Sequence, residues 1–268
     1  MLGYLVLENG DIFEGERIGH IVDAACEVVF NTGMAGYIET FTDPSYAGQG
    51  IVMTYPLIGN YGVIPEDFES EKIYAKAIFI HELAEFESNF RKKFNLETFL
   101  KNNKTPGLSN VNTRKLTKVL RDCGTMKGYL TSEIENMEEI LEKINEYKVT
   151  NVLNEVTSKA KVSFGKTKPK QIALIDYGFK HNIVNSLLKR DVGVTIYPAD
   201  TSVDMILSIR PDGILLSNGP GNPEECTFQI EVIKELYKTN IPIIGIGLRA
   251  SINGYSHRCK NKEIKIWS

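Results

Sequence analysis

The spacing of hydrophobic residues differs between the two halves of the chain. In its first half, short apolar or alternating runs such as YLVLE, EVVFNT, GIVMTY and AKAIFI are separated by turn-forming sequences that include ENGD and TDPSY. Runs of this length, bounded by Gly, Pro, Asn and Asp, are typical of β-strands. The first half is therefore predicted to be rich in β-structure.

Two segments of the first half carry helical periodicity instead. In VNTRKLTKVLRDCG, Asn112 or Thr113 can cap the helix and Gly124 can end it. In TSEIENMEEILEKINEYK, the apolar residues share one helical face. Ser132 and Glu135 have the spacing of a capping box there, which predicts that this helix begins at Ser132.

The second half alternates strands with helices. The apolar runs QIALIDYG, VGVTIYP, GILLSNGPG and IPIIGIG are separated by the amphipathic segments HNIVNSLLKRD, SVDMILSI and TFQIEVIKELYKT. Continuously apolar strands that alternate with helices predict a parallel α/β sheet. The predicted fold is therefore α/β overall, with a β-rich α+β N-terminal domain followed by a parallel α/β domain.

A change in composition marks the boundary between these domains. The segment EVTSKAKVSFGKTKPK is rich in Lys and ends near a Pro, which favours an interdomain linker over residues 154–170. The predicted domains are thus residues 1–153 and 171–248. Residues 249–268 form a basic, irregular tail without an amphipathic period.

The composition argues against several classes of protein. Of the 268 residues, 42% are hydrophobic and 24% are charged, and the net charge of −3 argues against a nucleic-acid-binding protein. No apolar run approaches the roughly 20 residues that span a bilayer, and the N-terminus resembles no signal peptide. The four scattered cysteines and four separated histidines have no metal-ligand or disulfide spacing, which is typical of a cytoplasmic protein.

Two loops at predicted strand ends carry candidate chemistry, because ligands of parallel sheets bind at the carboxyl ends of the strands. The glycines of SNGPGNP (217–223) let backbone N–H groups approach a ligand and stabilise an oxyanion. GIGLRAS (245–251) has the form of a turn that holds a nucleophile at its apex, yet the apex residue is Gly247. Taken alone, each motif is more often a tight turn.

Four segments resemble one family. EVVFNTGMAGYIETFTDPSYAGQGIVMTYPLIGNYG and VNTRKLTKVLRDCGTMKG are similar to the N-terminal domain of the small, glutamine-hydrolysing subunit of carbamoyl-phosphate synthetase. IALIDYGFKHNIVNSLLKR and DGILLSNGPGNP resemble the start of its class I glutamine amidotransferase domain, which is flavodoxin-like. The resemblance ends near Leu248 and implies a chain truncated within that domain. The block 30–62 argues against the class I amidotransferases of anthranilate or guanylate synthesis, which lack this N-terminal domain.

This resemblance implies a reaction and a partner. In the family, a Cys thiolate attacks the side-chain amide of L-glutamine and forms a thioester, with a His as base and a Glu that orients the His. Ammonia passes to a large subunit, where ATP and Mg act and carbamoyl phosphate is made for pyrimidine and arginine biosynthesis. The resemblance therefore implies a large-subunit partner, bound through the N-terminal domain, and no cofactor in this chain.

Residue by residue, the resemblance implies a glutamine-binding set and a missing nucleophile. Ser45, Gly219, Gly221 and Leu248 match positions that bind glutamine. The family pattern G-I-C-L-G-H-Q is replaced by GIGLRAS, so that Gly247 fills the nucleophile position, and the family His and Glu are not found in this sequence. We therefore expect a small subunit with defective glutaminase activity; the alternative is a non-catalytic docking module for the large subunit.

The tail carries a second signal, in another reading frame. When the residues from Gly247 onward are written in permitted codons, removal of one adenine after the Leu248 codon yields G-H-Q-L-M-A-I-A-I-G-A-K-T-K-K-L-K-Y-G. This run resembles the family sequence that follows the nucleophile. We hypothesise that residues 249–268 are a frame-shifted tail, which sequencing of the DNA from the Ile241 codon onward tests. We further expect residues 241–245 to stay in the sheet core and the tail to be poorly packed.

Overall fold

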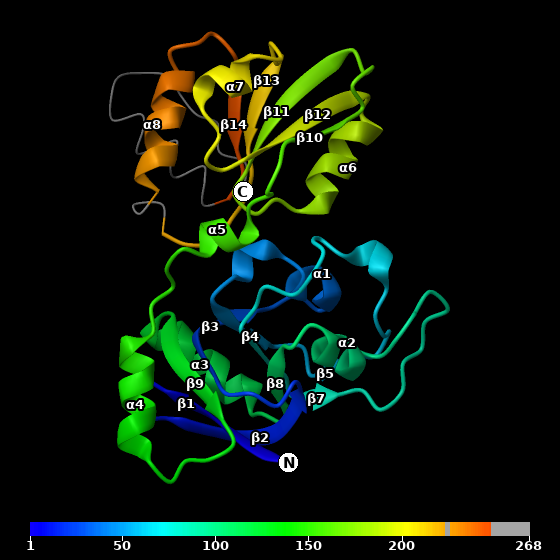
Figure 1. Cartoon of the computed structure of the whole chain (residues 1–268). Coiled ribbons are helices and arrows are strands. Elements are labelled where there is room, and N and C mark those ends of the chain that lie inside the picture. The colour runs from blue at the N-terminus through cyan, green and yellow to red at the C-terminus, as the bar shows by residue number, and fades with distance from the viewer. Residues whose placement is uncertain (223–225, 248–268) are drawn as a thin grey trace. The chain divides into compact units, whose positions relative to one another are not determined.

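The computed structural model describes residues 1–222 and 226–247. It divides the chain into two compact units, Met1–Thr150 and Asn151–Ser268 (Figure 1). The boundary predicted after residue 153 falls inside a short helix of the second unit, Val152–Val156. Within the described residues, no helix is long and apolar enough to cross a membrane.

The first unit is built on a closed β-barrel. Around the barrel the strands run in the order β1-β2-β8-β6-β4-β3-β9, and β5 and β7 form a separate two-stranded sheet. The strands of this unit are β1 (Leu2–Leu7), β2 (Ile12–Gly19), β3 (Ala24–Asn31), β4 (Gln49–Met53), β5 (Leu57–Ile58), β6 (Ala77–Phe79), β7 (Glu82–Leu83), β8 (Pro106–Ser109) and β9 (Met126–Thr131). Its helices are α1 (Tyr37–Phe41), η1 (Pro44–Tyr46), η2 (Pro65–Asp67), α2 (Leu96–Asn102), α3 (Thr113–Cys123) and α4 (Met137–Glu146).

Alternation of side chains across the strands builds the barrel core. Leu5, Val28 and Phe79 are fully buried in one apolar cluster that joins strands from different parts of the barrel. Closure depends on the antiparallel pairing of β1 with β9, in which Leu5 lies opposite Leu130. A closed barrel leaves no edge strand exposed to pair with another chain.

Both helices predicted by periodicity are present, but only the first begins where the sequence predicts. The first is confirmed, because the Asn112 side chain accepts a hydrogen bond from the Lys115 backbone N–H at 3.0 Å and caps α3. The prediction that a capping box at Ser132 starts the second helix is wrong, since α4 begins at Met137 and is capped by Asn136. The Ser132 hydroxyl instead lies 3.2 Å from the guanidinium of Arg17, a donor on strand β2.

The second unit is a five-stranded sheet with helices on both faces. The strand order is β10-β12-β11-β13-β14, and all neighbours are parallel except the antiparallel pair β10–β12. The strands are β10 (Val162–Phe164), β11 (Lys170–Asp176), β12 (Val192–Pro198), β13 (Gly213–Leu216) and β14 (Ile243–Gly245). The helices are α5 (Val152–Val156), α6 (His181–Lys189), α7 (Val203–Leu207) and α8 (Thr227–Leu236).

Opposite faces of this sheet are covered by different helices. On one face, Val184 of α6 packs with Leu174 and Val194. On the other face, Ile206 of α7 and Ile233 of α8 join the cluster that the remaining strand side chains form, as the separation of α6 from α7 and α8 in Figure 1 also shows. These layers and the parallel strand order confirm the predicted fold class, an α/β domain of the flavodoxin type after a β-rich domain.

Two predictions at the borders of this unit are met only in part. Residues 154–170 are not an interdomain linker throughout, because they belong to the second unit and Val162–Phe164 pair with β12 as an edge strand of the sheet. The prediction that residues 241–245 belong to the sheet core is met in part, because Ile241 and Ile243 are half-buried against the apolar cluster on the face of α7 and α8. Only Ile243–Gly245 form a strand, which pairs with β13, and Ile244 is 62% exposed. Leu248 and the tail 249–268 lie outside the described residues.

Candidate functional site

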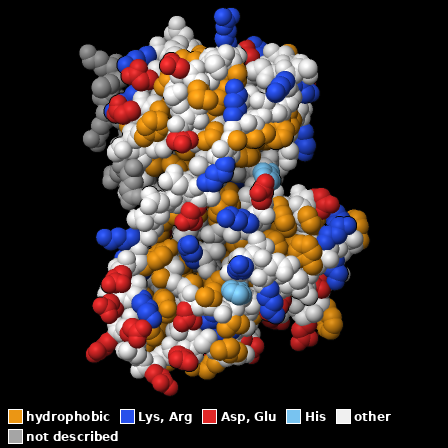
Figure 2. All heavy atoms as spheres, viewed as in Figure 1, with side chains coloured by type: hydrophobic (Ala, Val, Ile, Leu, Met, Phe, Trp, Pro, Cys, Tyr) orange, Lys and Arg blue, Asp and Glu red, His pale blue; other side chains and the backbone are white. Residues whose placement is uncertain are grey.

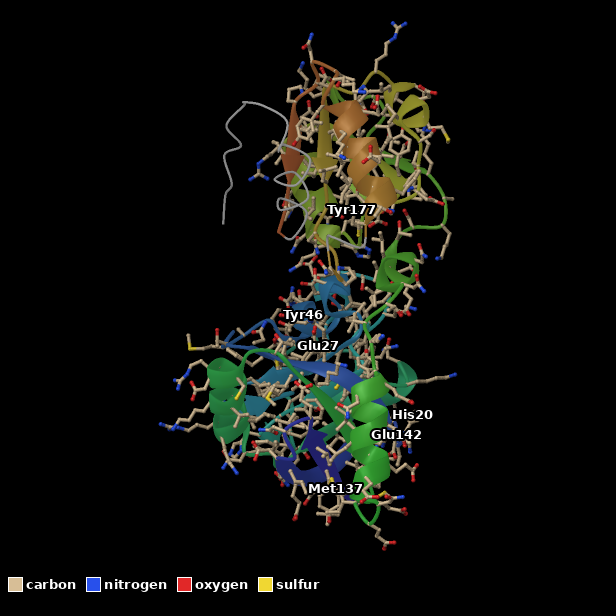
Figure 3. The ribbon with its side chains drawn as sticks, turned by 90° about the vertical axis from the view of Figure 1, so that its left-hand side faces the viewer. His20, Glu27, Tyr46, Met137, Glu142 and Tyr177 are labelled. Carbon is tan, nitrogen blue, oxygen red and sulfur yellow. The ribbon has the colours of Figure 1, made fainter. Side chains whose placement is uncertain are left out.

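The chain reverses its direction of winding at β11. From β11 it passes through α6 to β12 on one side, and it then crosses through α7 to β13 on the other side. The crevice for a ligand in a parallel sheet lies at such a switch point, outside the carboxyl ends of the two strands. The loops that follow β11 and β13 therefore form the candidate site, and Tyr177, labelled in Figure 3, is the first residue after β11.

Asp176, the last residue of β11, organises the backbone at this end of the sheet. Its carboxylate is 1% exposed and accepts hydrogen bonds from the backbone N–H groups of Gly178 at 2.8 Å, Phe179 at 3.0 Å and Ser158 at 2.7 Å. A second bond from this segment comes from the Thr157 hydroxyl, which donates to the Asp176 carbonyl at 2.7 Å. Because a buried carboxylate needs such donors, Asp176 ties the segment 157–158 to the loop after β11.

The loop after β13, residues 217–222, is attached to the same structure; it is called the glycine loop below. The Ser217 hydroxyl is fully buried, accepts a hydrogen bond from the Tyr177 backbone N–H at 2.9 Å and donates to the Asn218 carbonyl at 2.7 Å. The Asn218 side-chain amide donates to the carbonyl of Gly178 at 3.0 Å. The two strand-end loops therefore hold each other in one conformation.

Two of the predicted glutamine-binding positions require glycine in this loop. A Cβ atom at Gly219 would lie 1.9 Å from the Tyr177 carbonyl oxygen, far inside van der Waals contact. Gly221 has φ of +83°, in the left-handed region that side chains disfavour. The glycines thus keep the backbone of the loop close to its neighbours, with little side-chain bulk over the switch point.

The predicted nucleophile position lies beside this loop. The Ile246 backbone N–H donates to the Leu216 carbonyl at 3.0 Å, which continues the pairing of β14 with β13. Gly247 follows with φ of +63°, and among the described residues the atom nearest to an added Cβ is the Asn218 Cβ, at 3.8 Å. The turn at Gly247 therefore has the left-handed backbone of a strained apex and room for a side chain that glycine does not supply.

The two remaining predicted site residues are Ser45 and Leu248. Ser45 lies in the first unit, in η1, where its backbone N–H donates to the capping Asp43 carboxylate at 2.9 Å. Leu248 lies outside the described residues. The structure brings Gly219, Gly221 and Gly247 to one end of the second-unit sheet, and the assignment of Ser45 and Leu248 to the same site stays a prediction.

The thiols of the described residues differ in their environments. Burial, reinforced by the neighbouring Glu27 carboxylate, raises the pKa of Cys26 to about 12, so this barrel thiol stays protonated near neutral pH. Cys226 precedes α8, is 8% exposed and donates from its thiol to the Asn222 carbonyl at 3.7 Å. Cys123 is exposed at the end of α3. None of these thiols occupies the position of Gly247.

Sequence reasoning missed the residues that hold the two loops together, which are Asp176, Ser217 and Asn218. Asp176 did carry a signal, because an acidic residue directly after the apolar run IALI stands at the carboxyl end of a strand. Ser217 and Asn218 carried none beyond their place in a turn motif, since their partners Tyr177 and Gly178 lie about 40 residues away in the sequence.

Comparison with known families gives two matches along this chain. Residues 5–130 match the model of the carbamoyl-phosphate synthase small chain, CPSase domain. Residues 173–250 match the model of class I glutamine amidotransferases. The two matches follow the two units of the structure, one on the barrel unit and one on the parallel sheet.

Individual relatives resemble the whole chain. The carbamoyl phosphate synthase small chain of Clostridium perfringens (strain 13 / Type A) is 40% identical over 99% of this chain and 75% of its own length. The small chain of Listeria monocytogenes serotype 4b (strain F2365) is 42% identical over 97% and 75%. The pyrimidine-specific small chain of Bacillus subtilis (strain 168) is 43% identical over 97% and 74%.

A solved aminopeptidase from Aneurinibacillus sp. strain AM-1 matches 80% of this chain and 56% of its own, with a TM-score of 0.31 and 13% identity, a likeness too low to carry an argument.

Proposed function

This chain belongs to the family of carbamoyl phosphate synthase small chains, and on that premise we propose that it docks on the large chain without hydrolysing glutamine. The observation that carries this proposal is the identity and geometry of Gly247. Its backbone lies in the left-handed region beside the glycine loop, with 3.8 Å between an added Cβ and the nearest atom of the described residues. The scaffold for the chemistry is thus present, but the reacting side chain is not.

Glutamine hydrolysis in this class of site needs a thiolate. The thiolate attacks the carbon of the side-chain amide, ammonia leaves, and water later cleaves the thioester. Glycine has no atom that can form this bond, and Cys26 is protonated near neutral pH and belongs to the other unit. We therefore expect Ser45, Gly219, Gly221 and Leu248 to retain at most a glutamine-binding role.

The remaining role of the chain is then that of a partner. The name small chain, which the relatives carry, implies a larger chain with which they assemble. In this proposal the first unit binds the large chain, which holds ATP and Mg and makes carbamoyl phosphate from bicarbonate and ammonia. Free ammonia would replace ammonia from glutamine, and the product would serve pyrimidine or arginine biosynthesis.

A reconstitution experiment tests the proposal. Purified full-length chain is mixed with the large chain, ATP, Mg and bicarbonate, and carbamoyl phosphate is measured with glutamine or with ammonium chloride as nitrogen source. We expect co-elution of the two chains in size-exclusion chromatography, turnover with ammonium chloride, and no turnover with glutamine above the level of the large chain alone.

The control is a small chain of the family that has the nucleophile Cys, prepared in the same way. It should support turnover with both nitrogen sources, which shows that the large chain is competent. Glutamine-dependent turnover by the present chain would refute the loss of hydrolysis. Separate elution of the two chains would refute docking.

A further inference from the structure

The two Asn-Gly pairs of the described residues differ in what surrounds them. An asparagine that precedes a glycine loses its side-chain amide readily, because the glycine nitrogen attacks the amide carbon with no Cβ in its way. Asn9 and Gly10 lie at the exposed tip of the hairpin between β1 and β2. Asn218 and Gly219 lie in the glycine loop, where Asn218 is 7% exposed. The two pairs therefore share their covalent chemistry and differ only in their environment.

The hairpin tip holds Asn9 and Gly10 in a tight turn. The Gly10 N–H donates to the Leu7 carbonyl at 2.9 Å, and the Leu7 N–H donates to the Asp11 carbonyl at 2.9 Å. Gly10 has φ of +86°, and a Cβ added there would meet nothing within 4 Å among the described residues. This is the geometry of a three-residue hairpin loop that ends in a left-handed glycine. Water therefore has access to the glycine at the tip.

Two hydrogen bonds fold the Asn9 side chain over the peptide that follows it. Its Oδ1 accepts from the Asp11 backbone N–H at 3.0 Å, and its Nδ2 donates to the Asp11 carboxylate at 2.8 Å. The first bond closes a ring of atoms that includes the Gly10 nitrogen, so the attacking atom and the amide carbon belong to one closed turn. The same Asp11 N–H stabilises the negative charge that develops on Oδ1 during the attack.

One hydrogen bond opposes the attack at Asn9, whereas the whole loop opposes it at Asn218. The bond from the Gly10 N–H to the Leu7 carbonyl must open before the nitrogen reacts, and at the exposed tip water replaces it. The Asn218 amide donates to the Gly178 carbonyl at 3.0 Å inside a buried loop. Gly219 lies so close to the Tyr177 carbonyl that its peptide has no room to turn toward the amide.

We propose that Asn9 is a site of spontaneous deamidation and that Asn218 is protected from it. The Gly10 nitrogen forms a bond to Asn9 Cγ and gives up its proton, the Cγ–Nδ2 bond breaks, and ammonia leaves with that proton. The succinimide that results takes up one water molecule, which opens it at either carbonyl. Position 9 then carries an aspartate or an isoaspartate. Water is the co-reactant, and no atom is oxidised or reduced.

The reaction changes the charge and the length of the turn between β1 and β2. A carboxylate oxygen replaces the Nδ2 donor that lies 2.8 Å from the Asp11 carboxylate, so an attraction becomes a repulsion. This side of the unit is already acidic: α4, which packs on Val6 of β1, contains four glutamates, and acidic side chains gather along it in Figure 2. An isoaspartate also lengthens the main chain by a methylene. Because β1 closes the barrel against β9, deamidation weakens the first unit at its closure.

Peptide mapping of the aged protein tests the site. Full-length chain is incubated at mildly alkaline pH and digested, and mass spectrometry detects the gain of about 1 Da that marks each deamidated peptide. We expect the peptide with Asn9 to convert while the peptide with Asn218 keeps its amide. Gly10→Ala should slow the conversion of Asn9 by about tenfold, because the new Cβ hinders the attacking nitrogen.

A product mimic tests the effect on the barrel. Asn9→Asp should lower the Tm of the full chain by about 2–4 °C, because it places a second carboxylate beside Asp11. Asn240→Asp, which adds the same charge at an exposed position of the second unit, should leave the Tm unchanged. An unchanged Tm for Asn9→Asp would show that the turn tolerates the new charge and would overturn the predicted weakening.

A synthetic peptide of residues 5–14 supplies the rate of the unfolded sequence. If this peptide converts while Asn9 of the folded chain keeps its amide, the turn protects Asn9 and the proposed site is wrong. Equal rates at Asn9 and Asn218 would show that the environment does not select between the pairs, which also overturns the proposal. If low concentrations of urea accelerate the conversion of Asn9 in step with unfolding, the reaction belongs to the unfolded chain and not to the hairpin.

Discussion

Two neighbouring strand ends of the second unit differ in how they are held. The four residues of β13 are all buried, and the glycine loop that follows is joined to the loop after β11 through Ser217 and Asn218. The three residues of β14 lie at the edge of the sheet as the structure describes it, with Ile244 62% exposed, and among the described residues only the Asn218 Cβ lies within 4 Å of a Cβ added at Gly247.

The difference shows that the backbone of the glycine loop is held independently of the side chain at position 247. The conformation of the glycine loop depends on buried hydrogen bonds that do not involve residue 247. A change of side chain at position 247 therefore removes nothing from the network that holds the loop. Under the proposed function, the loop that would stabilise an oxyanion keeps its form although position 247 carries no nucleophile.

The strongest test of this contrast is Asp176→Ala. The substitution leaves three backbone N–H groups without their acceptor, one buried and two partly buried. Because an unsatisfied buried group costs about 1–3 kcal/mol, we expect the free energy of unfolding of the second unit to fall by about 4 kcal/mol. Urea unfolding followed by circular dichroism measures the change.

Two further variants sharpen that measurement. Asp176→Asn keeps an acceptor for Gly178 and Phe179 but turns an amide NH2 toward the Ser158 N–H, and it should cost about half as much. Asp200→Ala, at an exposed position, should stay within about 0.5 kcal/mol of the unmodified chain. A loss below about 1 kcal/mol for Asp176→Ala would show that the carboxylate does not organise the loops.

Gly219→Ala tests the close approach in the glycine loop. The new Cβ would lie 1.9 Å from the Tyr177 carbonyl oxygen, so the backbone of one loop must move, and we expect a cost of about 3 kcal/mol. Thermal unfolding of the full chain reports it as a lower Tm. An unchanged Tm would mean that the two loops are free to separate, against the hydrogen bonds between them.

Gly247→Cys should cost less, about 1 kcal/mol. The turn has space for the side chain, and the penalty comes only from a non-glycine residue at φ of +63°. The same denaturation series measures it, and reaction of the new thiol with a maleimide should be faster than that of buried Cys26. If Gly247→Cys lowers the free energy of unfolding as much as Gly219→Ala does, residue 247 is tightly packed. The two strand ends would then not differ in packing.

The smallest effect is expected at the edge strand. Ile244→Ala removes a side chain that is mostly in water, and it should lower the free energy of unfolding by about 0.5 kcal/mol. The matched substitution Leu216→Ala, on the neighbouring strand and fully buried, should cost about 3 kcal/mol. Similar values for the two variants would show that β14 is as well packed as β13.

The local sequence pattern predicted most helices and strands. It failed where a side chain bonds to a residue far away in the sequence. The stripe after Asn112 predicted α3 and its cap, because that cap bonds only three residues away. Ser132 has capping-box spacing too, yet its hydroxyl is taken by Arg17 and α4 starts later, at Met137. The segment 162–164 was assigned to a linker because three residues, with Val162 and Phe164 about two-fifths exposed, carry too little pattern to reveal an edge strand.

By itself, the sequence determined the α/β class, the family and the absence of a thiol at position 247, because these depend on residue types and on their spacing along the chain. Only the tertiary structure decided that the barrel closes through β1 and β9, that Asp176 joins segments 18 residues apart, and that Asn9 is exposed while Asn218 is buried. The physical reason is the same in each case: long-range contacts and exposure depend on what the folded chain places next to a residue, which no local pattern encodes.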